Sequence, residues 1–363
     1  MSAADRVTVA QLTADPHPSW HRLRAEAPVA RVPALGGWVV LDHPTAAAVL
    51  RDAGTFTVDD PRFSTARVFG PSMLSTEGAV QARHRAAFTP PLRPGPVRSR
   101  YTGLVRAEAR RLLAAGNPVE LRGRVAAPLA TTVMCRLLGL AVQPAVLLDW
   151  YAEIVAGVDR LSGGGEVGPA AERAHGRLRH ELARTVPTGT GLTEAELAAN
   201  AGVLLFGGIE TTEAMIALAA WHLLGQPAQA AAVRADRTLL AGAVEESMRL
   251  EPAASRVDRY ATRDVELAGA SIRAGELVIV SLAAANRDPA VFAEPDYYDA
   301  TRQNAHRNLT FAAGPHYCLG AHLARLEAAT VLDELLDRSA RLVAAEPPRG
   351  LVFRKPRAVT VAW

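Results

Sequence analysis

The spacing of apolar and polar positions divides the 363-residue chain into a mixed beginning, a long helical middle and a mixed end. Near the N-terminus, apolar residues at helical spacing predict helices over 18–30 and 43–51, with a strand at Trp38–Leu41 between them. From Thr55 to Gly78 the pattern dissolves into Asp, Pro, Ser and Gly. Long irregular segments of this kind are typical of functional loops.

Helical periodicity dominates from about residue 79 to residue 250, with breaks in the proline-rich stretch 90–96, at 162–165 and at 187–191. Shorter apolar runs then predict strands at 265–267, at 277–282 and near 352 and 359, with one strong helix from Cys318 to about Ser339. No internal repeat or charge block divides the chain. We therefore expect one mostly α domain with small β-sheets over residues 1–363, with a β-rich N-terminal part at about 25–65.

Composition narrows the class of protein. Hydrophobic residues make up 49% of the chain, and 40 Lys+Arg against 37 Asp+Glu leave a net charge of only +3, which argues against a nucleic-acid binder. Cys135 and Cys318 are too far apart in sequence to indicate a disulfide framework or a Cys-rich zinc site, so a cytoplasmic location fits best. The apolar stretch 201–224 could span a membrane by length, but Glu210, Glu213 and His222 favour a buried helix and no membrane partner.

The segment from Phe311 to Gly320 offers the clearest chemistry. Gly314 and Gly320 flank Cys318 just before a predicted helix. The free N–H groups of a helix N-terminus favour a thiolate over a thiol, so a sulfur placed there is suited to bind a metal or to react. For a lone cysteine, the alternative is a small buried apolar side chain.

A second unusual segment interrupts the apolar helix at residues 204–212 with Gly207, Gly208, Glu210, Thr211 and Thr212. Buried polar groups are costly unless they are paired, so a helix used only for packing would not choose them. The hydroxyl of Thr211 can compete for the carbonyl of Gly207, four residues earlier, and open the helical turn. The alternative is that the two threonines only bond back to their own helix.

The chain resembles the cytochrome P450 family. The haem loop of that family is matched by Phe311, Gly314, His316, Cys318, Gly320 and the run Leu323–Arg325, whereas Ala312 stands where glycine is common. The resemblance implies the P450 fold and haem b, with the thiolate of Cys318 as the iron ligand. Glu246 and Arg249 match the family's Glu-x-x-Arg pair, a structural clamp. Tyr297 occupies the place of the clamp's usual third member, and Arg302 is the nearest substitute.

The resemblance also implies roles for residues around the haem. Glu210 and Thr211 take the acid and alcohol positions of the oxygen-activation motif, beside a gap that could seat dioxygen and a water. Phe311, Gly314 and Gly320 shape the haem loop. The propionate partners implied by position are Gln81, Arg85, Arg259 and His316. Gln81 replaces the usual histidine, while His84 is expected at the surface.

By this resemblance the protein is a monooxygenase that activates O2 and oxidises a small apolar or aromatic molecule, with hydroxylation in bacterial secondary metabolism as the leading reaction. Oxidative coupling, ring closure or desaturation, and a non-catalytic haem sensor, remain alternatives. A ferredoxin and a ferredoxin reductase would supply electrons. The basic residues Arg83, His84, Arg85, Arg98 and Arg100 could form an ordinary solvated face, or part of this cluster could serve docking.

By the same resemblance, the substrate pocket is expected to be formed by the loop 55–78, the helices that flank residues 162–165, the helix residues just before Gly207 and the strand after Glu251. Its candidate residues are Phe63, Phe69, Met73, Leu204, Gly207, Ile209, Ala253 and Val257. The chain is short for this family, and we expect the shortening between Trp150 and Leu192, where the roof of the pocket would lie. This predicts a trimmed or open lid of shortened distal helices.

Overall fold

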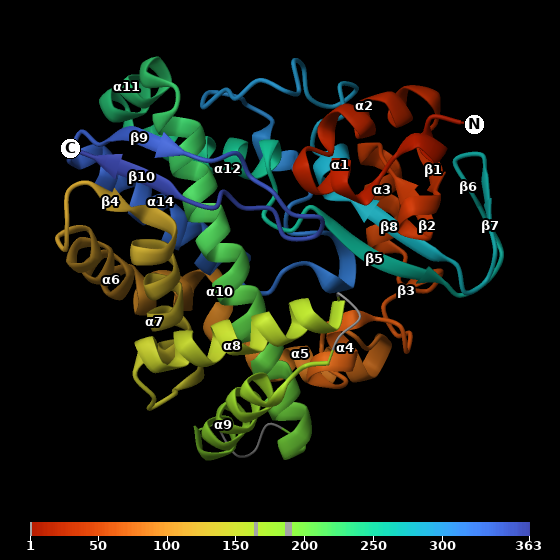
Figure 1. Ribbon diagram of the computed structural model, residues 1–363, viewed down its shortest axis with the longest axis horizontal. Helices are drawn as coiled ribbons and strands as arrows, with labels where there is room; N and C mark the ends of the chain where they lie inside the picture. The colour runs from red at the N-terminus through yellow and green to blue at the C-terminus, as the bar shows by residue number, and fades with distance from the viewer. Residues whose placement is uncertain (1, 163–165, 186–190) are drawn as a thin grey trace.

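The computed structural model describes residues 2–162, 166–185 and 191–363. Figure 1 shows helices gathered around one long helix, α10 (Glu194–Leu224), with the N-terminal strands on one side of it and the C-terminal strands on the other. The other helices in chain order are α1 (Val9–Ala14), α2 (His17–Glu26), α3 (His43–Arg51), α4 (Ser64–Phe69), α5 (Gly78–Leu92), α6 (Pro94–Leu113), α7 (Ala127–Leu138), α8 (Pro144–Ser162), α9 (Pro169–Thr185), α11 (Pro227–Ala235), α12 (Leu240–Leu250), α13 (Leu282–Ala285) and α14 (Ala321–Asp337).

The strands form three small sheets. The largest has the order β1-β2-β8-β5-β3, in which β2 and β8 are parallel and the other neighbours antiparallel. Its strands are β1 (Val29–Val32), β2 (Gly37–Val40), β3 (Phe56–Thr57), β5 (Arg256–Ala261) and β8 (Leu277–Ser281). The second has the order β4-β10-β9, formed by β4 (Val119–Glu120), β9 (Arg341–Ala345) and β10 (Val359–Ala362), and the third pairs β6 (Val265–Leu267) with β7 (Ala270–Ile272).

The start of helix α10 is fixed by its first residues. Thr193 and Glu196 form a capping box, in which each side chain accepts a hydrogen bond from the other residue's backbone N–H. Beyond this cap the helix is apolar on most sides because α7, α12 and α14 pack around it in the hydrophobic core. Within the described residues it is the one helix long and apolar enough to cross a membrane, but 72% of its most apolar window is buried inside the fold. This is the burial expected of a core helix.

Helices α8 and α9 cover one side of α10 (Figure 1). They are continuous helices of 19 and 17 residues that pack against each other. Leu147 and Ile154 of α8 and Leu178 and Leu182 of α9 share one hydrophobic cluster with residues of α10. Of the expected trimmed or open lid, the open alternative is therefore wrong, because burial of these apolar faces against α10 holds both helices in place. The shortening of the two helices stays a prediction.

Most predicted elements are present, with a few differences. The helix 43–51 and the strand at 38–40 are confirmed, but residues 29–32 form a strand rather than the end of a helix. The loop 55–78 contains β3 and α4. Near Val352 the structure has two isolated bridges, Phe353 with Ala254 and Arg349 with Lys355, in place of the predicted strand, and β9 was not predicted. The predicted breaks at 162–165 and 187–191 fall mostly on residues outside the described part of the chain.

Candidate active site

The loop 311–320 is held closely against its neighbours. The N–H of Cys318 donates to the carbonyl of Phe311 at 2.9 Å, and α14 begins directly after Gly320. Gly314 has a φ of +69°, and a Cβ added there would lie 2.5 Å from the carbonyl oxygen of Leu50 at the end of α3. Only glycine fits this approach. Ala312 also has a positive φ of +57°, which strains a residue with a side chain and explains why glycine is common at this position.

Cationic side chains lie on both sides of Cys318. The Cys318 side chain is exposed, and the protein packed around it raises the pKa of its thiol through desolvation, against the opposing influence of the Gly320 N–H and of the charges on Arg85 and Arg325. Arg85, half-buried on α5, donates to the carbonyl of Tyr317 at 2.5 Å. Arg325 pairs with Glu245, and its guanidinium lies 4.5 Å from the centre of the Phe311 ring. These groups favour the thiolate form that an iron ligand requires.

The predicted partners of the haem propionates gather beside this loop. Arg259 on β5 is 3% exposed, and burial lowers its pKa to about 10 despite the nearby charges of Glu77 and Asp258. It donates to the carbonyl of Asp258 at 2.8 Å. Nε2 of His316 lies 2.9 Å from Glu77 Oε2, while its Nδ1 is buried and has no hydrogen-bond partner among the described residues. Within the part of the chain that the structure describes, this buried cation is bonded to a neutral carbonyl alone and lies near an unpaired imidazole nitrogen, which suits the carboxylates of a haem.

Gln81 supports the haem loop in this structure. It is buried on α5, and its Nε2 donates to the carbonyl of Pro315 at 2.9 Å. Glu77 lies just before α5. Its pKa is lowered because hydrogen bonds from His316 and from the N–H of Val58 outweigh the effect of its burial. The start of α5 is therefore fastened to the loop through His316 and Pro315.

The clamp behind the loop is complete. Arg249 donates through Nε and Nη2 to the two oxygens of Glu246 at 2.7 and 2.8 Å, and both side chains are fully buried. Arg302 donates to Glu246 at 2.9 Å, so it is the third member. Tyr297 contributes its carbonyl oxygen, which accepts from both Arg249 and Arg302. The ion pair that would be weak on an exposed helix is here a buried network.

The polar turn of α10 has one open side and one packed side. The hydroxyl of Thr211 donates to the carbonyl of Gly207 at 2.5 Å, as the four-residue spacing predicts. A Cβ at Gly207 would meet nothing within 4 Å, whereas a Cβ at Gly208 would lie 2.4 Å from the sulfur of Met134 on α7. Gly208 therefore allows α10 to approach α7, and Gly207 leaves space beside Thr211.

Glu210 takes part in contacts that the sequence did not reveal. Lys355 Nζ lies 2.5 Å from Glu210 Oε1 and 2.6 Å from Glu213 Oε1. The hydroxyl of Tyr151, on α8, donates to Glu210 Oε2 at 3.0 Å. The one available signal was compositional, since Lys355 is the only lysine in a chain that otherwise uses arginine.

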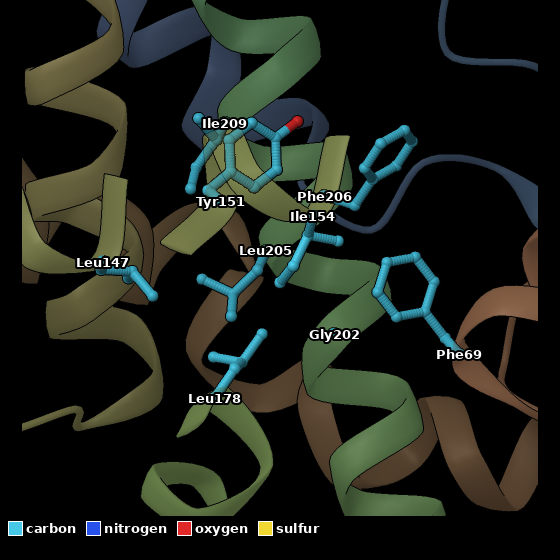
Figure 2. A pocket seen from close by; sticks show the side chains of 9 residues that line it. All are labelled: Phe69, Leu147, Tyr151, Ile154, Leu178, Gly202, Leu205, Phe206 and Ile209. Atoms are coloured by element: carbon cyan, nitrogen blue, oxygen red, sulfur yellow. The ribbon is translucent and has the colours of Figure 1, made fainter. Parts of the chain in front are cut away.

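The structure places the substrate-pocket candidates in different parts of the fold. Phe69 and Ile209 line a small apolar pocket between α4, α8, α9 and α10 (Figure 2), and Met73 packs in the same hydrophobic cluster. That pocket has a cavity volume of about 10 Å³, no more than one water molecule needs, so it is packing space rather than a substrate chamber. Leu204 packs partly against this cluster, and Gly207 faces the open side of α10.

The remaining candidates lie elsewhere. Phe63 packs with Val58 and Tyr260 in a separate cluster, so its assignment to the pocket stays a prediction. Val257 packs on the core of the large sheet, and Ala253 is buried with its carbonyl bonded to the N–H of Arg354.

Sequence reasoning missed two aromatic residues, Phe206 and Phe353. Their rings form a T-shaped pair with centres 5.3 Å apart, and Phe206 also lies 6.0 Å from Phe69. Phe206 immediately precedes Gly207, and Phe353 lies next to the predicted strand near 352, so their positions in the sequence were the available signal.

Two basic residues of the proposed docking cluster are engaged within the protein. His84 is buried, at 1% exposure, and lies 3.1 Å from Glu196 and 3.2 Å from the side-chain amide nitrogen of Asn200, so the expectation of a surface position is wrong. Arg83 forms an ion pair with the same Glu196 at 2.5 Å. Both residues therefore fasten α5 to the first turn of α10.

Comparisons with known proteins show the family of this chain. A family profile for cytochrome P450 matches residues 178–340. The chain is 34% identical to cytochrome P450 monooxygenase PikC of Streptomyces venezuelae, over 96% of this chain and 91% of that protein. It is 32% identical to 20-oxo-5-O-mycaminosyltylactone 23-monooxygenase of Streptomyces fradiae, over 96% and 90%. The solved structure of P450BioI with an acyl carrier protein carrying hexadec-9Z-enoic acid superposes with a TM-score of 0.87 at 27% identity, covering 98% and 100% of the two chains.

These matches define the class as bacterial haem-thiolate oxygenases. The chain belongs to the cytochrome P450 family. It is a monooxygenase with the P450 fold, similar to hydroxylases and oxygenases of secondary metabolism, and the cofactor of its family is a haem held by a cysteine thiolate. Bacterial members typically receive electrons from a ferredoxin and its reductase.

Proposed function

We propose that Cys318 is the thiolate ligand of a haem b, held by Arg85, Arg259 and His316, and that the protein hydroxylates a small apolar or aromatic molecule. The observation that carries this proposal is the loop 311–320 at the N-terminus of α14, which lies near the cations Arg85 and Arg325 and beside a buried Arg259 to which no carboxylate of the described residues is bonded. A haem supplies O2 binding and O–O bond cleavage, which a thiolate ligand promotes by donating electron density.

The surrounding residues prepare the site for this chemistry. The charges of Arg85 and Arg325 stabilise a thiolate at Cys318. Arg259 and the unpaired Nδ1 of His316 would bind the propionates, and the clamp of Glu246 and Arg249 would keep the segment before the loop rigid. Thr211 would position a proton donor on the open side of α10, and Glu210 would supply protons to that donor.

For the partners, we propose a ferredoxin that docks on the face where Arg98 and Arg100 of α6 are exposed. Both side chains are free to meet an acidic surface, unlike Arg83, which is already paired. A single domain over residues 1–363 acting in the cytoplasm completes the proposal. Coupling, ring closure or desaturation remains the second candidate, because the same site residues serve either outcome.

An optical spectrum of the reduced, CO-bound protein tests the haem assignment. The Soret band is expected where a thiolate ligand places it, and it should move to the position of histidine-ligated haem in Cys318→His. Cys135→Ser is the matched control, because Cys135 is a free, buried cysteine on α7. A wild-type band at the histidine position would contradict the assignment. Product formed under ¹⁸O2 separates the two reactions, since only oxygen insertion labels the product.

A further inference from the structure

Glu210 is held at both ends by other parts of the chain. Lys355 binds one carboxylate oxygen at 2.5 Å, and Tyr151 of α8 donates to the other at 3.0 Å. The side chain of Glu210 is 10% exposed, and that of Lys355 is 26% exposed. In this arrangement Glu210 is an acceptor at both oxygens, so a proton can leave through it only after one of these contacts breaks.

Lys355 is rigidly presented to α10. Arg354, which precedes Lys355, is 2% exposed and donates to Glu251 and to the carbonyls of Pro348 and Gly350. The backbone groups of Lys355 and Arg349 bond to each other in an isolated bridge, which closes the turn. The ammonium of Lys355 is therefore placed beside Glu210 by a segment that is held on several sides. Tyr151, in contrast, reaches Glu210 from α8, a helix that covers α10.

That residue 355 is a lysine matters as much as where it lies in the fold. Lys355 is the only lysine in the chain, although 40 residues are Lys or Arg. One ammonium nitrogen can approach two carboxylates closely, here Glu210 and Glu213 at 2.5 and 2.6 Å, whereas a guanidinium presents a planar fork. Arg122 also binds Glu213, at 3.0 Å, and it has the same exposure as Lys355.

We propose that Lys355 is a positioning residue that restrains Glu210 and sets how readily it supplies protons to Thr211. In each transfer Glu210 gives one proton towards Thr211 and regains one from solvent, while the ammonium keeps its own protons. The carboxylate must leave Lys355 for this to occur, so its release limits the rate of proton supply. This inference rests on the proposed role of Glu210.

The contact can be tested without turnover, because a protein with one lysine labelled with [ε-¹³C]lysine gives a single side-chain NMR signal. In the haem-loaded protein, Glu210→Gln should shift that signal, and Asp60→Asn, in a remote exposed ion pair, should not. An unchanged signal in Glu210→Gln would overturn the proposal, whatever the enzyme's activity proves to be.

The kinetic test compares Lys355→Met with Arg122→Met, which removes a cation from the same cluster without touching Glu210. Lys355→Met should raise the rate of product formation about twofold and increase the solvent deuterium isotope effect. The reason is that proton transfer then limits the rate, in place of the release of the Glu210 carboxylate from Lys355. Arg122→Met should change neither quantity. In the Glu210→Gln background, Lys355→Met should have no further effect.

If Lys355→Met does not fold, Lys355→Gln keeps a hydrogen-bond donor and should change both quantities in the same direction. The inference fails if the Lys355 variant behaves as Arg122→Met does, or if its effect persists in the Glu210→Gln background. Failure of the proposed function has a different signature, namely no product in any variant while the NMR signal still shifts in Glu210→Gln.

Discussion

Arg302 donates from Nε to Oε1 of Glu246 at 2.9 Å, an oxygen that also accepts from Arg249. Glu246 is fully buried, and Arg302 is 9% exposed. Two guanidinium groups thus share one carboxylate, although Tyr297 occupies the place in the sequence where the second cation was expected. The segment around Tyr297 contributes its backbone carbonyl, and the charge comes from five residues further along the chain.

Removing that charge should destabilise the protein. Arg302→Ala takes a charged hydrogen bond from a buried carboxylate, and we expect it to lower the free energy of unfolding by about 2 kcal/mol. Arg307→Ala, an exposed arginine nearby, is the control and should change stability by less than about 0.5 kcal/mol. Urea unfolding followed by circular dichroism measures both values, and equal stability of the two variants would contradict the assigned role of Arg302.

The two left-handed positions of the haem loop predict opposite effects. Ala312→Gly should stabilise the protein by about 0.5 kcal/mol because it relieves a positive φ. Gly314→Ala should cost more than about 2 kcal/mol and reduce haem retention, because its Cβ would collide with backbone atoms of α3. Gly103→Ala, in the open middle of α6, is the control and should be neutral or stabilising. Thermal unfolding and haem content test the set, and loss of stability in Ala312→Gly would refute the strain.

Thr211→Ala should separate electron consumption from product formation. We expect haem and substrate binding to be nearly unchanged while reducing equivalents are diverted to peroxide, because the hydroxyl that would position the proton donor is lost. Thr211→Ser keeps the hydroxyl and should retain much of the coupling. The measurement is product and peroxide per NAD(P)H consumed, and full product yield in Thr211→Ala would show that protons take another path.

His222 makes stability depend on pH. Burial lowers its pKa to about 3, and it bonds Ser247 at 2.8 Å and stacks on Tyr298. Between pH 6.5 and about 3 the unfolded chain takes up a proton there that the folded chain does not, so stability falls as pH is lowered through this range, by up to about 1.4 kcal/mol per pH unit.

We therefore expect His222→Gln to show a shallower loss of stability between pH 6.5 and 5, where carboxylates contribute least. His306→Gln, at an exposed histidine, should keep the wild-type slope. Urea midpoints measured at several pH values give the slopes. Parallel curves for the wild type and His222→Gln would exclude this histidine as the cause.

The sequence was informative where a residue's role depends on its near neighbours. The helix 43–51, the loop around Cys318 and the bond from Thr211 to Gly207 all follow from spacing within ten residues. The contact from Lys355 to Glu210 joins residues 145 positions apart, and no periodicity in either segment reveals it. Likewise, Phe63 lies in the predicted loop but faces Val58 and Tyr260, because the turn of the chain there is set by packing against the sheet.

The parallel pairing of β2 with β8 has a consequence for how the chain is made. Val39 pairs with Ile279, so an N-terminal strand must wait for a neighbour about 240 residues further along. At the usual pace of bacterial translation this delay is about 10 to 50 seconds. During that time the edge of β2 that will pair with β8 has no partner strand, and an unpaired strand edge promotes aggregation. A newly made chain would therefore depend on chaperones at its N-terminal end, and slowing synthesis between these strands should increase aggregation.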